Sequence, residues 1–164
     1  MGVALVSRAM SGERIVGDVV VAIDLSERSD AVLQEGVALA RASGGVLHVL
    51  HVAGGEPVLA GYDKEDVSSF TRTARAGELT DEHRRLRELA DDITAGGVEA
   101  RALVLMGPTA EMILDAAEHL GASHVVLGSH GHGGLHHLLV GSVAEEVVRR
   151  SPVAVVLVPV RPPS

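Results

Sequence analysis

Short apolar runs alternate with longer amphipathic stretches along the chain from residue 18 onward. The runs are rich in valine and leucine and carry few polar residues, which is typical of strands covered on both faces. The stretches between them place apolar residues at helical spacing, so the alternation indicates βαβ units around a parallel sheet. The predicted strands cover residues 18–23, 46–52, 99–105, 124–127 and 153–158.

Turn and capping residues predict where the intervening helices begin and end. Ser26 is expected to cap a helix that runs to about residue 42 and stops at the glycine pair 44–45. Further helices are expected to begin at Thr80, at Gly107-Pro108 and at Ser142. The periodicity predicts that the following positions face the sheet: Leu33, Gly36, Val37, Ala40, Leu86, Leu89, Ala90, Ile93, Ile113, Ala116, Ala117 and Leu120.

Right-handed crossovers between these strands predict one Rossmann-like α/β domain, a three-layer sandwich with a five-stranded parallel sheet. The chain length of 164 residues suits a single domain, expected over residues 18–160. Residues 1–17 are expected to form an N-terminal extension and residues 161–164 a C-terminal tail. Residues 53–79 have no sustained period and are predicted to be a loop-like surface insertion.

Composition narrows the classes of partner. Aromatic residues make up 1% of the chain, as Tyr62 and Phe70, so the stacking platforms of single-stranded nucleic-acid binders are missing. The net charge of −8 also argues against nucleic acid, although residues 124–164 are less acidic and hold five of the nine histidines. The absence of cysteine fits a reducing cytoplasm, and no apolar run is long enough to span a membrane. We therefore expect a cytoplasmic protein without nucleic-acid or membrane partners.

A glycine-rich stretch, GSHGHGGLHHLLVGS over residues 128–142, separates the fourth strand from the last helix. Ligands of open α/β sheets bind at the carboxyl ends of strands. Small residues let backbone N–H groups approach an anion, and the following helix start adds unpaired donors and a positive dipole end. The Ser142 hydroxyl could meet a phosphate oxygen or a metal ion. The pattern therefore favours a phosphate site.

A purely structural explanation of the same stretch remains open on spacing alone. The glycines could serve turns with positive φ, and Ser142 with Glu145 matches a capping box. The stretch is neither a P-loop, since it lacks the lysine and the P-loop spacing, nor a dinucleotide fingerprint, which follows a first strand.

Two separated motifs together resemble a known family. Gly128, Gly131, Gly141 and Ser142 fit the spacing G-x(2)-G-x(9)-G-[ST], and the segment Ala22–Ser26 (AIDLS) closes the first strand. Over residues 18–160 the chain resembles the ATP-binding branch of the universal stress proteins. This resemblance implies a strand order of 3-2-1-4-5, a nucleotide between the first and fourth strands, and a homodimer formed through the strand Val153–Val158.

The resemblance also implies roles for particular residues. Asp24 would face the nucleotide and its ion, and the backbones of Ile23 and Val52 would contact the adenine. The phosphates would lie on the loop that starts at Gly128, which includes His130 and Gly131 and ends at Gly141, Ser142 and Val143. A carboxylate that faces phosphates requires a cation, so Mg²⁺, or Mn²⁺ in its place, is implied, bound by Asp24. The alternative for Asp24 is a simple partner for a helix dipole.

Histidine occupies positions 130, 132, 136 and 137, where members of the family often carry arginine or lysine. Since histidine gains charge below about pH 6.5, ATP binding is expected to strengthen there. Another role for these histidines is a transition-metal site formed by His132, His136 and His137, although no nearby cysteine or carboxylate completes the ligand set. The three strand histidines, His48, His51 and His124, are expected to be solvated or structural.

The leading functional hypothesis is an ATP-binding protein that acts in stress response or signalling through its nucleotide-bound state. One alternative is a dimerisation and interaction module of the same fold whose loop holds no nucleotide. Another is a slow ATP hydrolase in which Asp24 or a loop histidine acts as a base. The spacing of the sequence predicts no catalytic Ser-His-Asp set or carboxylate pair, so no catalytic residue is assigned.

Overall fold

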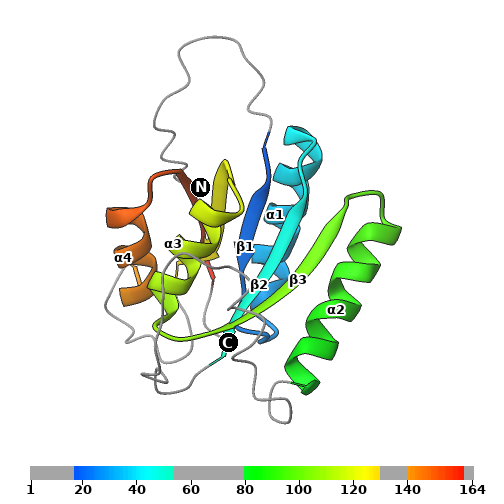
Figure 1. Cartoon of the computed structure of the whole chain (residues 1–164), viewed down its shortest axis with the longest axis horizontal. Coiled ribbons are helices and arrows are strands. Elements are labelled where there is room, and N and C mark those ends of the chain that lie inside the picture. The colour runs from blue at the N-terminus through cyan, green and yellow to red at the C-terminus, as the bar shows by residue number, and fades with distance from the viewer. Residues whose placement is uncertain (1–16, 54–79, 130–139, 161–164) are drawn as a thin grey trace.

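The computed structural model of the chain describes residues 17–53, 80–129 and 140–160 (Figure 1). The predicted N-terminal extension, the insertion over 53–79 and the C-terminal tail lie almost entirely outside these residues, as do loop residues 130–139. The strands are β1 (Val19–Ala22), β2 (Leu47–Ala53), β3 (Ala100–Met106), β4 (His124–Gly128) and β5 (Ala154–Val158). The helices are α1 (Ser29–Ser43), α2 (Thr80–Ala95), α3 (Thr109–His119) and α4 (Ser142–Arg150).

The sheet has five parallel strands in the order β3-β2-β1-β4-β5, which confirms the expected fold and strand order. β1 is the central strand, and its last residue, Ala22, lies level with Leu50 of β2 and with Leu127 of β4. The chain crosses to opposite sides of β1 in its two halves, so the carboxyl ends of β1 and β4 meet at the switch point of the sheet. Such points are where open α/β sheets bind ligands.

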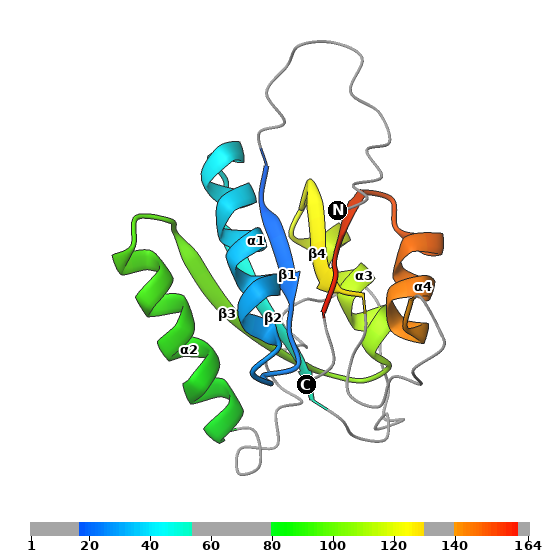
Figure 2. The same ribbon diagram turned by 180° about the vertical axis from the view of Figure 1, so that it is seen from behind.

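Helices cover both faces of this sheet (Figures 1 and 2). α3 and α4 pack on one face, around Val20, Leu50 and Val125, which are fully buried. α1 and α2 pack on the other face, around Val19, Val21 and related residues. The central strands β1 and β4 are therefore almost wholly buried, as their unbroken apolar composition predicts, whereas the edge strands β3 and β5 are mostly half-buried. Among the described helices, none has the length and apolar character needed to cross a membrane.

Helix caps are where the sequence-based prediction fails. α1 begins at Ser29 rather than after Ser26, and Arg28 stands at its N-cap without a side-chain cap bond. Ser26 instead donates hydrogen bonds to the Asp24 carboxylate, which competes for its hydroxyl. Pro108 occupies the N-cap of α3 instead of its first helical position. The predicted helix stripes are confirmed as core contacts, although Leu33, Val37, Leu89, Ile93 and Leu120 are only half-buried.

Candidate functional site

Four of the predicted site residues come together at the carboxyl edge of the sheet. The Ile23 N–H donates to the Leu50 carbonyl at 2.9 Å, so the pairing of β1 with β2 extends one residue beyond β1. The register of β1 with β4 ends at Ala22 and Leu127, so Ile23 and Gly128 each follow a last paired residue, and Asp24 comes directly after Ile23. Val52 lies on β2 two residues beyond Leu50, the partner of Ala22, just as Asp24 lies two residues beyond Ala22. These residues from three adjacent strands thus share one edge.

The two ends of the glycine-rich loop are tied together at the same edge. The Ser129 N–H donates to the Val158 carbonyl at 2.8 Å, which continues the pairing of β4 with β5. The Gly141 N–H then donates to the Ser129 carbonyl at 2.7 Å. The start of α4 is therefore held directly beside the end of β4. His130 and Gly131, together with the other loop histidines, lie outside the described residues.

The start of α4 does not use a capping box. Gly141 is the N-cap, with φ −72° and ψ 157°, and no side chain caps the helix. Ser142 is the first residue inside the helix, so its hydroxyl is not positioned as a cap, and the alternative of a Ser142–Glu145 capping box is wrong. Gly141 also adopts an extended conformation open to any residue, so a left-handed turn does not explain a glycine there. The first N–H groups of α4, including those of Ser142 and Val143, have no carbonyl partner within the helix.

Asp24 is exposed and its carboxylate has a fixed orientation. Its Oδ1 accepts hydrogen bonds from the Ser26 N–H at 3.1 Å, the Ser26 hydroxyl at 2.6 Å and the Ser29 hydroxyl at 2.8 Å. These contacts organise the turn into α1, so a structural role for Asp24 is present. Among the described residues, no three histidine or carboxylate side chains converge as a metal site.

Ile23 and Val143 can offer a ligand little besides their backbones. The Ile23 side chain is 8% exposed and belongs to the core on the α1 and α2 face. Its carbonyl already accepts a hydrogen bond from His51 Nδ1 at 2.9 Å, which leaves one lone pair. Val143 packs its side chain against the opposite core. The contact between His51 and Ile23 was missed in the sequence, where only the repeated Leu-His-Val at 47–49 and 50–52 could have drawn attention to it.

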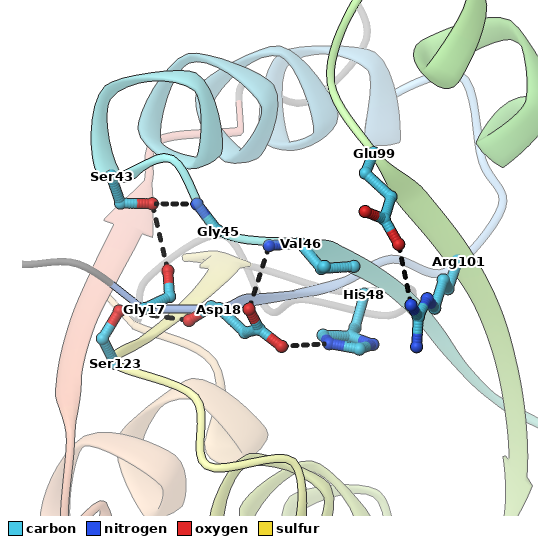
Figure 3. Close-up of polar contacts among 9 residues, drawn as sticks. All are labelled: Gly17, Asp18, Ser43, Gly45, Val46, His48, Glu99, Arg101 and Ser123. Carbon is cyan, nitrogen blue, oxygen red and sulfur yellow. Dashed lines mark hydrogen bonds and ion pairs between the residues drawn. The ribbon is translucent and has the colours of Figure 1, made fainter.

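A second polar group, the amino-end cluster, lies at the opposite edge of the sheet (Figure 3). The Asp18 carboxylate accepts hydrogen bonds from the Val46 N–H and from His48 Nε2, each at 2.9 Å. Burial acts to raise the pKa of Asp18, but the hydrogen bonds from His48 and Val46 and the nearby charges of His48 and Arg101 outweigh it and lower that pKa. The cluster ties β1 to β2 far from Asp24, so it stabilises the sheet and is separate from the candidate site.

Two of the strand histidines are buried at this amino edge. His48 is 5% exposed and His124 is 7% exposed, so their role is structural and neither is solvated. Burial lowers the pKa of His124, whose Nδ1 lies 2.8 Å from the Ser123 hydroxyl.

Comparison with known proteins agrees with this architecture. The model of the universal stress protein family matches residues 16–159. Universal stress protein YxiE from Bacillus subtilis is 33% identical over 143 residues, covering 84% of this chain and 95% of that protein.

Two solved structures resemble the fold and carry a bound nucleotide. A universal stress protein in complex with cAMP superposes with a TM-score of 0.60 at 25% identity, covering 88% of this chain and 97% of that one. The universal stress protein from Archaeoglobus fulgidus in complex with dAMP has a TM-score of 0.60 at 23% identity, covering 88% and 98%. Given the match of the family model and the identity to YxiE, the chain belongs to the universal stress protein family.

Proposed function

We propose that this chain binds ATP with Mg²⁺ at the carboxyl edge of the sheet, between β1 and β4, and acts in stress response or signalling through its nucleotide-bound state. The observation that carries the proposal is the hydrogen bond from the Gly141 N–H to the Ser129 carbonyl. It holds the first turn of α4, whose leading N–H groups have no carbonyl partner within the helix, beside the end of β4 at Gly128. The relatives solved with cAMP and dAMP support an adenine nucleotide as the ligand.

The phosphates would be bound by the start of α4 and by the loop from Gly128 to Gly141. The N–H groups of Ser142 and Val143 would donate to phosphate oxygens, together with the Ser142 hydroxyl, and the helix dipole favours the negative charge. His130 and Gly131 belong to the same loop and would complete its contacts. Bound Mg²⁺ would neutralise the phosphate charge, and the Asp24 carboxylate, exposed and fixed by three hydrogen bonds, is suited to hold it.

The adenine would lie against the backbones of Ile23 and Val52. Because the Ile23 N–H and one lone pair of its carbonyl are already engaged, Ile23 would offer only its remaining carbonyl lone pair. Val52 is half-buried at the same edge and would supply further backbone contact. This arrangement needs no aromatic side chain to stack on the adenine, which agrees with the 1% aromatic content of the chain.

The proposal extends to assembly and location. β5 is an edge of the sheet, and each of its residues is half-buried, so residues 153–158 present an apolar strand that can pair with a second copy. A homodimer through this strand is part of the proposal, and so is a cytoplasmic location, which the lack of cysteine supports.

Substitution of Gly141 by alanine tests the role of the loop. The extended backbone at Gly141 accommodates alanine, so the free energy of unfolding is expected to change by less than about 0.5 kcal/mol. If the backbone lies close to phosphate, the added Cβ weakens Mg·ATP binding about tenfold or more. Affinity measured by titration calorimetry and stability measured by urea unfolding separate the two effects.

Two serines at opposite ends of α4 provide the control. Ser142→Ala removes a proposed phosphate donor and is expected to weaken Mg·ATP binding several-fold. Ser151→Ala removes a hydroxyl that bonds the Val153 carbonyl at the far end of α4, so it is expected to leave affinity unchanged. Unchanged affinity in Gly141→Ala would contradict a close approach of the Gly141 backbone to phosphate. A lack of measurable Mg·ATP binding by the unsubstituted protein would favour a nucleotide-free interaction module.

A further inference from the structure

Strand β2 carries two histidines that hold the two ends of β1 in different ways. His48 lies level with Val20 and bonds the Asp18 carboxylate at the amino edge, while His51 bonds the Ile23 carbonyl at the carboxyl edge. Since side chains alternate along a strand, the two histidines, three residues apart, project from opposite faces of the sheet. Only His51 therefore contacts the segment that leads into the candidate nucleotide site.

The contact made by His51 fixes one peptide group. A carbonyl can only accept, so the Nδ1 of His51 carries the proton and donates it to the Ile23 oxygen at 2.9 Å. This carbonyl and the Asp24 N–H belong to the same planar peptide group. The bond therefore sets the orientation of the peptide through which the chain enters Asp24.

The residues after this peptide adopt a costly conformation that needs support. Leu25 has φ +59°, in the left-handed region that side chains other than glycine rarely adopt. On one side of it, Asp24 Oδ1 accepts three hydrogen bonds from Ser26 and Ser29. An exposed contact from Arg85 to the Leu25 carbonyl is longer, at 3.3 Å. On the strand side, the His51 side chain fixes the backbone through its bond to the Ile23 carbonyl.

We infer that His51 is a positioning residue for nucleotide binding, because it holds the Ile23–Asp24 peptide so that the Asp24 carboxylate faces the nucleotide edge before ligand arrives. The inference rests on the proposed function. His51 does not contact the nucleotide itself in this scheme. It lowers the conformational cost of binding by keeping the turn after β1 in its binding-competent form.

Three variants test the role of His51. His51→Leu introduces an apolar side chain of moderate size and removes the donor. His51→Asn keeps an N–H close to the position of Nδ1 while it shortens the side chain. His48→Leu is the matched control, because it removes the equivalent hydrogen bond at the amino edge. Mg·ATP affinity is measured by titration calorimetry, and the free energy of unfolding by urea titration.

A readout without nucleotide monitors the turn directly. The Ser26 N–H is hydrogen-bonded to Asp24 Oδ1 at 3.1 Å, so its amide hydrogen exchange reports whether the turn keeps its conformation. His51→Leu is expected to speed exchange at Ser26 relative to the other amides of the chain and to weaken Mg·ATP binding about five- to tenfold, the effect of one hydrogen bond. His51→Asn is expected to stay within about threefold of the unchanged protein, even if it unfolds more easily.

The outcomes separate this inference from the proposal on which it rests. His48→Leu is expected to lose stability while it keeps its Mg·ATP affinity and its Ser26 exchange rate. Unchanged affinity in a folded His51→Leu protein, or an equal loss of affinity in His48→Leu, would overturn the positioning role and leave the proposed function standing. Failure of the unsubstituted protein to bind Mg·ATP would overturn both.

Discussion

Substitution of Gly45 by alanine is predicted to be among the most destabilising single changes at the amino edge of the sheet. A Cβ on Gly45 would lie 2.1 Å from the Gly17 carbonyl oxygen and 2.8 Å from the Asp18 nitrogen. Both are backbone atoms, so the turn into β2 has to move. That movement disturbs the hydrogen bonds from Ser43 to Gly17 and from Val46 to Asp18. At about 1 kcal/mol for each bond, with about 1–3 kcal/mol of packing strain, the expected loss is about 3–5 kcal/mol.

The adjacent glycine provides a control with a different physical cause. Gly44 has φ +72°, and a Cβ there would meet nothing within 4 Å. Gly44→Ala therefore costs only the left-handed conformation, about 1–2 kcal/mol. Urea unfolding at neutral pH measures both variants, and the melting temperature of Gly45→Ala is expected to fall by about 6 °C or more. If the two variants had the same stability, the close approach of the Gly17 backbone would be refuted.

The remaining predictions concern pH and assembly. Burial lowers the pKa of His124, so below about pH 6.5 the unfolded chain takes up a proton at this residue more readily than the folded chain does. The free energy of unfolding is therefore expected to fall as the pH drops below about 6.5, and to fall less steeply in His124→Asn. The pKa of Asp18 is lowered in the folded chain, so its contribution to stability is present above about pH 4 and is lost as the pH falls through the folded pKa. The free energy of unfolding of Asp18→Asn should therefore differ from that of the unchanged protein less at pH 2.5 than at pH 6. Sedimentation equilibrium is expected to give twice the chain mass of 17.0 kDa, and a single-chain mass at every concentration tested would contradict pairing through β5.

The strands and helices of this fold were predictable because apolar runs and glycine pairs mark them in the sequence. Each observed strand lies within one or two residues of its predicted bounds, and α4 matches from Ser142 to Arg150. The order of the strands could not be predicted in the same way, because periodicity does not show which strands are neighbours. That order followed from the family resemblance, and the register of β1 with β2 and β4 confirms it.

The hydrogen-bond partners of the polar side chains were less predictable, because only the folded chain brings together the groups that a hydroxyl or an imidazole can bond. Ser26 and Ser142 both have sequence contexts typical of helix caps, yet Ser26 bonds the Asp24 carboxylate and Ser142 lies inside its helix. His48 and His51 have identical neighbours in the sequence, and the fold sends one to a carboxylate and the other to a carbonyl. The spacing of the glycines predicts a nucleotide site at the edge where β1 and β4 end, and that site stays a prediction.

The nucleotide content of the purified protein shows whether the carboxyl edge of the sheet binds Mg·ATP. The protein is purified with Mg²⁺ present throughout and then denatured, and the supernatant is separated by ion-exchange chromatography. If the carboxyl edge binds Mg·ATP as proposed, the supernatant is expected to contain adenine nucleotide that is strongly reduced in the Gly141→Ala protein. A supernatant free of adenine nucleotide, from protein whose melting temperature does not rise with added Mg·ATP, would contradict the account.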